Sequence, residues 1–334
     1  MKLFIGLTFT LLQLFTSAQT PHLLARFDSI SFRGLSVVNK HIIWASGTHG
    51  TVVKSVDGGK HWTRLKVRDF EERDFRDIEA FDDKIAVLMA VGEPAQILKT
   101  TDGGESWKIV FSDSTRGMFL DALDFANKKD GVVVGDPVNG LAFIAYTRDQ
   151  GEHWLVDQNA PPLLDGEAFF AASGSNIKAI ESPDSGSLSY IMATGGSHSR
   201  LFIGSSAYST PLQQGSQSSG ANALLLIPGT GKIVIVGGDY RIDSMSRGNC
   251  TVYSVEGGSF VQPKVPPHGY RSCVHALSPG RLIACGTSGI DLSTDGGMTW
   301  KLISRQSFHV CAGGGNSTPV FLAGPDGKIA ELNW

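Results

Sequence analysis

Four short pairs that join an aromatic residue to a basic one could supply binding chemistry. They are Phe32-Arg33, Phe75-Arg76, Tyr270-Arg271 and Phe308-His309. Each pair stands where an apolar, strand-like run begins. A guanidinium group presents a planar fork of donors that matches a carboxylate or a phosphate. The pairs therefore predict a site for a carboxylate, a phosphate or an acidic peptide, if the fold brings them together.

Recognisable catalytic motifs are absent from the sequence. It has no glycine-rich nucleotide loop opening a helix, no HExxH and no GxSxG elbow. The four cysteines, Cys250, Cys273, Cys285 and Cys311, form no CxxC pair, which argues against zinc. Reduced thiols and disulfides both stay open as descriptions of their state. We expect no catalytic residue, no cofactor and no metal.

A motif with the pattern Ser/Thr-x-Asp-x-Gly-x-x-Trp occurs four times. Its aspartates Asp57, Asp102 and Asp149 are spaced by 45 and 47 residues, and a worn copy around Glu256 precedes Asp295 by 39 residues. The Asp and Ser/Thr side chains suit hydrogen bonding within a turn, and the Trp suits apolar packing. We therefore assign a structural role to the aspartate and tryptophan of each copy: Asp57, Trp62, Asp102, Trp107, Asp149, Trp154, Asp295 and Trp300.

The elements that must position these residues are short strands. Seven glycine-marked loops, each preceded by an apolar run, recur with a period of roughly 45 residues, which is typical of propeller blades. The fold class predicted is all-β, a seven-bladed β-propeller of four-stranded antiparallel blades. Residues 328–334 and 22–29 are expected to share the last blade, which closes the ring and hides sheet edges. Residues 205–220 lack the motif and are expected to form a worn hairpin or an exposed loop.

In a propeller, the start of each inner strand lies on the same face as the loop between the second and third strands. The basic residues of those two positions should therefore surround one mouth of the central channel. An equally open alternative is that each arginine pairs with a nearby acid such as Asp74. The pattern also changes in units three and four, to Phe119-Leu120 and Phe169-Phe170. The predicted partner-binding residues are Arg33, Arg76, Arg271, His309, His198, Arg200 and Arg241.

The N-terminal residues resemble a secretory signal. Lys2 precedes an apolar run, and small residues end at Ala18, where we expect cleavage. The domains predicted are residues 1–18 as signal peptide and 19–334 as one propeller, in the periplasm or secreted. No other segment is apolar enough to span a bilayer. The formal net charge of −3 over 334 residues gives no reason to expect nucleic acid as a partner.

The repeated Asp-Gly-Gly turns, the glycine loops and the Phe-Arg strand starts resemble the photosystem II stability and assembly factor family. This resemblance covers nearly the whole mature chain. The motif Ser/Thr-x-Asp-x-Gly-x-x-Trp, known as the Asp box, also occurs in other proteins. It implies a non-enzymatic propeller that holds a protein or acidic peptide partner through a basic channel face. The arginine pattern is matched by Arg33, Arg76 and Arg271, and it is interrupted at Leu120.

An enzymatic alternative remains. Sialidases clamp a carboxylate with three arginines, and the sequence offers three candidates for the channel. A small carboxylate or a sugar would then be the ligand. Against this, the segment Phe32-Arg33-Gly34-Leu35 lacks the Arg-Ile-Pro signature of sialidases, and no nucleophile pair can be assigned.

Overall fold

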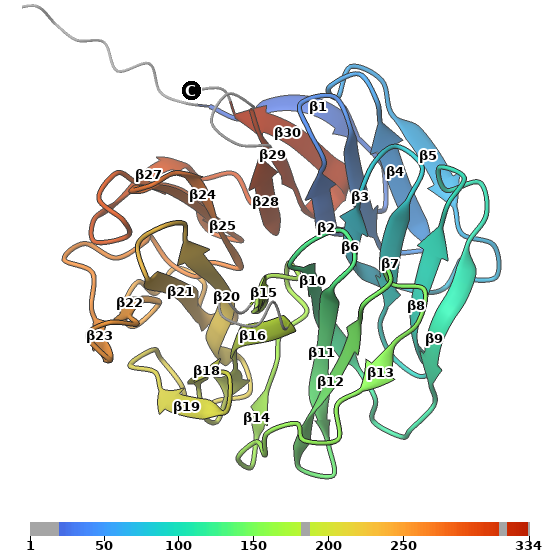
Figure 1. Ribbon diagram of the computed structural model, residues 1–334. Helices are drawn as coiled ribbons and strands as arrows, with labels where there is room; N and C mark the ends of the chain where they lie inside the picture. Colours follow the sequence, from blue (N-terminus) through green and yellow to red (C-terminus); the bar gives the residue numbers. More distant parts are fainter. Residues whose placement is uncertain (1–19, 182–187, 314–318, 333–334) are drawn as a thin grey trace, which may run out of the picture.

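The structure is a computed structural model that describes residues 20–181, 188–313 and 319–332 (Figure 1). The predicted signal peptide, residues 1–18, lies outside these ranges. Seven antiparallel sheets surround a common axis, which confirms the predicted seven-bladed all-β propeller. Within the described ranges, no helix has the length and apolar character needed to cross a membrane.

The first three blades are regular four-stranded sheets whose strands follow one another from the channel to the outside of the ring. Blade 1 contains β2 (Phe32–Val37), β3 (Ile43–Gly47), β4 (Thr51–Ser55) and β5 (Thr63–Lys66). Blade 2 contains β6 (Phe75–Ala80), β7 (Ala86–Ala90), β8 (Ala95–Thr100) and β9 (Lys108–Asp113). Blade 3 contains β10 (Leu120–Phe125), β11 (Gly131–Val138), β12 (Leu141–Thr147) and β13 (Leu155–Val156).

Blades 4 to 6 follow the same order, with one addition. Blade 4 contains β15 (Ile177–Glu181), β16 (Leu188–Ala193), β18 (Arg200–Ile203) and β19 (Ser206–Ser209). Blade 5 contains β20 (Ser219–Ile227), β21 (Lys232–Asp239), β22 (Cys250–Ser254) and β23 (Ser259–Val261), and the short strands β14 (Glu167–Ala168) and β17 (Gly195–Gly196) extend it to six. Blade 6 contains β24 (Cys273–Ser278), β25 (Arg281–Gly286), β26 (Gly289–Ser293) and β27 (Trp300–Ser304).

Blade 7 joins the two ends of the chain. It contains β28 (Val310–Gly313), β29 (Val320–Ala323), β30 (Lys328–Leu332) and, on its outside, β1 (His22–Arg26). The short 3₁₀ turn η1 (Pro325–Gly327) links β29 to β30. This is the arrangement expected from the sequence, because β1 supplies the fourth strand that the C-terminal unit lacks.

The innermost strands form the wall of the central channel. Each one packs against the innermost strand of the next blade, in the closed order β2, β6, β10, β15, β20, β24 and β28. The second strands are largely buried: all residues of β3, β7 and β29 are buried, whereas β11 and β16 are each partly exposed at one end. They lie between neighbouring sheets on both faces, so their sequences read as continuous apolar runs rather than as alternating ones.

The four turns that carry the repeated motif, Asp-Gly-Gly in three copies and Asp-Gln-Gly in the third, connect the two outer strands of blades 1, 2, 3 and 6. In each turn the Ser or Thr hydroxyl accepts the N–H of the glycine two residues after the aspartate at 2.8–3.0 Å and donates to the aspartate at 2.8–2.9 Å. The indole N–H of Trp62, Trp154 and Trp300 donates to the carbonyl of that glycine, whereas the buried Trp107 Nε1 has no such partner among the described residues. The turn is thus held by its own side chains.

Blade 4 lacks this motif. A tight turn at Gly204 and Ser205 joins β18 to β19, and residues 210–218 then lead to blade 5. Residues 205–220 were expected to form a degenerate hairpin or an exposed loop. They contain the second strand of a short hairpin, β19, followed by a loop.

Candidate functional site

The inner strands of four blades share an irregularity near the channel axis. The strand register shifts at Arg33, Arg76, Asp121 and Asn222, so each of these residues sits in a β-bulge between two paired neighbours. Bulges re-aim a side chain away from the regular alternation of a strand. The residue of blade 3 that is equivalent to the arginines is consequently Asp121, one position beyond the Leu120 expected from the sequence.

All four bulge side chains line one cavity of about 330 Å³ at the centre of the ring, which we call the axial cavity. Its wall also includes the rings of Phe119, Phe169, Phe170, Tyr240 and Tyr270, together with Asp136, Thr287 and His309. Two predicted arginines and the predicted histidine are therefore brought together, and an aromatic lining accompanies them.

A segment of blade 4, residues 169–176, runs across the channel axis; we call it the axial segment. Its carbonyl groups at Ala172 and Ala171 lie 3.4 Å from Arg33 Nη1 and 3.5 Å from Arg76 Nη1. On another side, Ser173 Oγ donates to the carbonyl of Ser272 in blade 6 at 2.7 Å. The axial segment thereby contacts blades 1, 2 and 6, and its residues 169–172 form part of the wall of the axial cavity.

The two arginines are incompletely paired. Arg76 Nη2 lies 3.6 Å from Asp74 Oδ2, which is the local acid expected as an alternative, and its guanidinium also stacks over Phe119 at 5.7 Å. The buried Arg76 Nε has no hydrogen-bond partner among the described residues. Burial, followed by repulsion from Arg76, lowers the pKa of Arg33. Both groups therefore retain donors that a ligand could use.

Burial also shifts the other titratable groups of the axial cavity towards their neutral forms. It raises the pKa of Asp121 well above its usual range, with a further contribution from Asp136, and it raises the pKa of Asp136 itself. Burial and the charges of Arg33 and Arg76 lower the pKa of His309 to about 3. The imidazole is thus uncharged at neutral pH, so it serves as a hydrogen-bonding group and not as a third cation.

Arg271 does not face the axial cavity, and its expected place there is wrong. It is fully buried and paired with Asp291 of β26, which receives both Nε, at 2.8 Å, and Nη2. Its remaining donors meet the carbonyls of Tyr270 and His268 and the hydroxyl of Ser288 at 2.7–2.8 Å. No bulge re-aims this side chain at the start of β24, so an acid from the same blade captures it.

The three remaining predicted residues also lie outside the cavity wall. Arg200 forms an ion pair with the buried Glu167, at 2.6 Å from Nη2 to Oε2. His198 and Arg241 are exposed at the surface. None of these three side chains lines the axial cavity, so they are not part of the site that Arg33 and Arg76 form. A partner contact of His198 and Arg241 stays a prediction.

Sequence reasoning missed Asn222 and the axial segment. Asn222 Oδ1 accepts the hydroxyl of Tyr270 at 2.7 Å, which fixes the ring that lines the cavity. The available signal was the run of small residues 171–175, because only small side chains allow a segment outside the strands to pass close to the axis.

A second polar group consists of Glu79, Asp124 and Lys178, which lie on the inner strands β6, β10 and β15. Lys178 Nζ of β15 lies 2.8 Å from Asp124 Oδ2 of β10. Burial raises the pKa of the nearby Glu79 to about 8, and repulsion from Asp124 adds to this rise while Lys178 opposes it. Glu79 is thus protonated in the folded protein at pH values where it is ionised in the unfolded chain.

We expect this carboxyl to make stability depend on pH. The folded state holds the Glu79 proton more tightly, so the free energy of unfolding should fall as pH rises from 4.5 to about 8. Denaturant titrations across this window should show that the Glu79→Gln variant loses less stability than the wild type as pH rises. The ratio of the two unfolding constants should change by up to about tenfold per pH unit. Parallel curves for the two proteins would contradict the prediction.

Comparisons with known proteins agree with this architecture. No family model matches the sequence. The photosystem II assembly lipoprotein Ycf48 of Synechococcus sp. (strain CC9902) is 28% identical over 162 residues, which covers 46% of this chain and 44% of that relative. The chain thus matches less than half the length of this curated relative.

Solved structures match along nearly the whole chain. YCF48 bound to D1 peptide has a TM-score of 0.65 at 17% identity, covering 96% of each chain. YCF48 from Cyanidioschyzon merolae has a TM-score of 0.61 at 15% identity, covering 95% of this chain and 99% of the other. The WD40 propeller domain of Doa1 reaches 0.62 at 13% identity, covering 96% and 98%, so fold similarity extends beyond one family. The predicted resemblance to the photosystem II assembly factors is confirmed: this chain is similar to Ycf48 in sequence and shares its propeller fold.

Proposed function

We propose that this chain is a non-enzymatic propeller that binds an acidic segment of a partner protein in the axial cavity. The observation that carries the proposal is the pair of partly buried guanidinium groups, Arg33 and Arg76, which face one cavity with donors left over. A carboxylate accepts such donors in charge-assisted hydrogen bonds, which strengthen when water is excluded.

The remainder of the cavity wall suits a peptide rather than a bare anion. Aromatic rings from blades 3, 4, 5 and 6 surround the arginines and offer an apolar surface of the kind that peptide side chains occupy. Asp121, whose pKa is raised by burial, also borders the cavity beside Asp136. We propose that the arginines hold the acidic side chain and that the rings hold an apolar neighbour.

The comparisons support a protein partner. The relative with the detectable sequence match is named as an assembly factor, and one solved propeller of the same fold was captured with a peptide bound. We transfer to this chain the class of ligand, a peptide segment of another protein, and leave the identity of that protein to experiment.

The sialidase alternative receives less support from the geometry. A three-arginine clamp would need Arg271 beside Arg33 and Arg76, but Arg271 is buried against Asp291. The axial cavity therefore offers two guanidinium groups to a carboxylate.

We also propose that the propeller acts after export, in the periplasm or outside the cell. The apolar N-terminal run and the small residues that end at Ala18 support this. N-terminal sequencing of the protein recovered from the envelope should begin at Gln19, and retention of residues 1–18 would contradict the proposal.

Binding can be tested on an array of heptapeptides that vary in acidic and aromatic content. The purified propeller should enrich peptides that carry Glu or Asp beside an aromatic residue. The double variant Arg33→Gln, Arg76→Gln should lose about tenfold or more in affinity for these peptides, because each charge-assisted hydrogen bond contributes about 1.5–3 kcal/mol. The matched control is Arg241→Gln, which removes an exposed guanidinium outside the cavity.

Two results would count against the proposed site. One is an unchanged peptide profile in the double variant, with a thermal midpoint equal to that of the wild type. The other is an array without preference for acidic peptides.

A further inference from the structure

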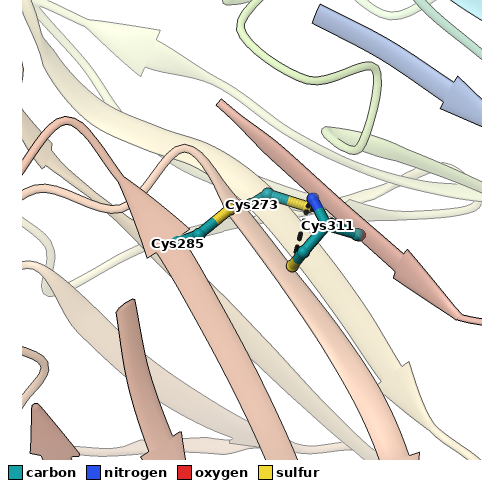
Figure 2. Close-up of side chains that lie close together, drawn as sticks. All are labelled: Cys273, Cys285 and Cys311. Carbon is teal, nitrogen blue, oxygen red and sulfur yellow. Dashed lines mark hydrogen bonds between the residues drawn. The ribbon is translucent and has the colours of Figure 1, made fainter. Parts of the chain in front are cut away.

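Three of the four cysteines meet in the core, although they lie far apart in the sequence. Cys273 of β24 faces Cys285 of β25 across the ladder of blade 6, and Cys311 comes from β28 of the next blade (Figure 2). All three are at most 3% exposed. Their sulfur atoms lie within 4.8 Å of one another, and Cys273 Sγ and Cys311 Sγ are 3.7 Å apart. We call this group the thiol cluster.

The spacing of the sulfurs fits a shared metal ion. Metal–sulfur bonds of about 2.3 Å place the sulfurs of a trigonal or tetrahedral thiolate site about 4 Å apart. A disulfide needs sulfurs at about 2.05 Å, roughly half the separation of Cys273 and Cys311. The thiol cluster could therefore close on an ion with small movements, whereas a disulfide would require the sulfurs to approach much further.

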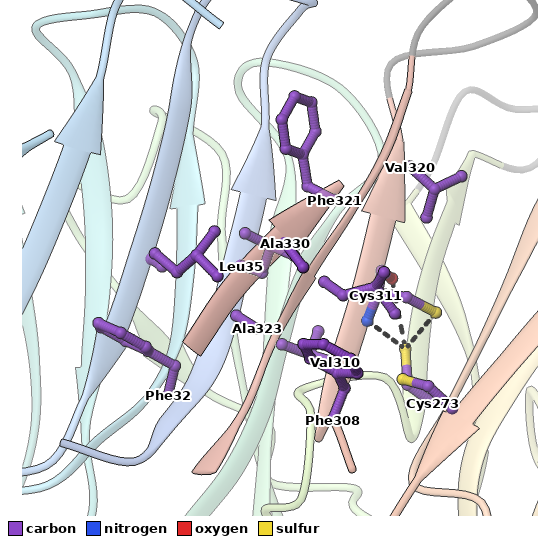
Figure 3. Packing of buried hydrophobic residues seen from close by; sticks show 14 of the residues in the cluster. Phe32, Leu35, Cys273, Phe308, Val310, Cys311, Val320, Phe321, Ala323 and Ala330 are labelled. Carbon is purple, nitrogen blue, oxygen red and sulfur yellow. Dashed lines mark hydrogen bonds between the residues drawn. The ribbon is translucent and has the colours of Figure 1, made fainter. Parts of the chain in front are cut away.

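The donor atoms around the thiol cluster indicate which metal ion fits the site. Cys273 and Cys311 belong to an apolar core with Phe308, Val310 and Val320 (Figure 3), and Cys285 belongs to the same cluster. Within the described residues, no histidine or carboxylate joins the three sulfurs as a fourth ligand. Zinc in structural sites takes four ligands, whereas soft sulfur donors also select Cu(I). A site with three sulfurs and no hard donor thus favours Cu(I), which accepts low coordination numbers.

Hydrogen bonds to the central sulfur would support a thiolate. Cys311 N lies 3.5 Å from Cys273 Sγ, and Ser175 Oγ of the axial segment lies 3.8 Å from the same atom. Such donors orient thiolate ligands and spread their charge. Ser175, Gly174, Ala312 and Gly313 are partly exposed, whereas the three cysteines themselves are buried.

We propose that Cys273, Cys285 and Cys311 bind one Cu(I) ion through their three sulfurs. Copper enters and stays as Cu(I), and the thiol protons that it displaces leave to solvent, so no oxidant or reductant takes part. This site is separate from the axial cavity and does not depend on the proposed peptide.

The proposal is tested by titrating the reduced full chain with Cu(I) under anaerobic conditions, in competition with a chromophoric Cu(I) chelator. The wild type should retain one copper per chain and show a raised thermal midpoint, because binding to the folded state stabilises it. Cys273→Ser and Cys311→Ser should each bind about tenfold or more weakly. Cys250→Ser is the matched control, since Cys250 is also a buried free cysteine but lies outside the thiol cluster.

X-ray absorption at the copper edge of the wild-type protein supplies a test that needs no variant. We expect three sulfur neighbours at about 2.3 Å. Fewer than three sulfurs, no copper retained against the chelator, or equal affinity in the Cys311→Ser variant would each overturn the proposal. A Cys273–Cys311 disulfide in protein isolated without reductant would overturn it as well.

Discussion

Replacement of Arg271 by methionine should lower the free energy of unfolding by about 3–5 kcal/mol, the loss seen when one partner of a buried ion pair is removed. Arg271 and Asp291 are 0% and 1% exposed at their side chains. Without the guanidinium, Asp291 would keep a buried charge whose main partner is gone, and the carbonyls of Tyr270 and His268 would lose a donor. The result can be measured by chemical denaturation.

Two further variants test whether the broken ion pair with Asp291 causes this loss of stability. Arg271→Met combined with Asp291→Leu should recover much of the loss, because an apolar pair of similar volume can replace a buried ion pair. Arg33→Met should change stability far less, since this guanidinium borders the axial cavity and no carboxylate of the described ranges bonds it directly. If Arg271→Met instead left stability intact and abolished peptide binding, our description of Arg271 as a structural residue would be wrong.

Replacement of Gly327 by alanine should destabilise the closure of the ring by about 2–5 kcal/mol. Gly327 has a φ of +64°, a left-handed conformation that costs other residues roughly 1–2 kcal/mol. An added Cβ would also collide with the backbone of Phe27, and overpacking of this kind costs about 1–3 kcal/mol. Gly327 exchanges hydrogen bonds with Phe27 and Ile30, so the collision falls where the N-terminal segment meets blade 7.

Gly229→Ala is the matched control for this effect. Gly229 has a φ of +71°, but an added Cβ would have no neighbour within 4 Å. Its substitution should therefore cost only the backbone contribution of roughly 1–2 kcal/mol. Equal losses in thermal and chemical denaturation for the two variants would show that the contact with Phe27 carries no weight.

The blade architecture was predictable because its signals are local. A hydroxyl, an aspartate, a glycine two residues further on and a tryptophan lie within eight residues. Their own hydrogen bonds hold the outer turn in blades 1, 2, 3 and 6. The second strands were predictable for a related reason: burial on both faces requires an unbroken apolar run. The fourth strand of blade 7 was predictable as well, because the C-terminal unit contains three strands and the N-terminal segment could supply the fourth.

The wall of the axial cavity was only partly predictable. Arg33, Arg76 and His309 were identified by their place at the starts of inner strands, and all three line the cavity. Asn222 and Asp121 were not assigned to the wall, because a bulge shifts the register by one residue and the aromatic marker that precedes the arginines is displaced or lost there. Residues 169–172 complete the cavity wall, and the small residues 171–175 that follow the two phenylalanines carry no periodic signal.

The sequence by itself determined the number of blades, their outer turns and the positions where inner strands begin, since each depends on residues close together in the chain. The tertiary structure alone decided which charged groups meet. Arg271 follows an aromatic residue in the sequence, as Arg33 and Arg76 do, yet Asp291, twenty residues further on, binds it inside blade 6. Cys273, Cys285 and Cys311 meet only because β24, β25 and β28 pack side by side. A repeat motif specifies the position of a backbone, whereas the direction and partners of a buried side chain depend on every strand packed around it.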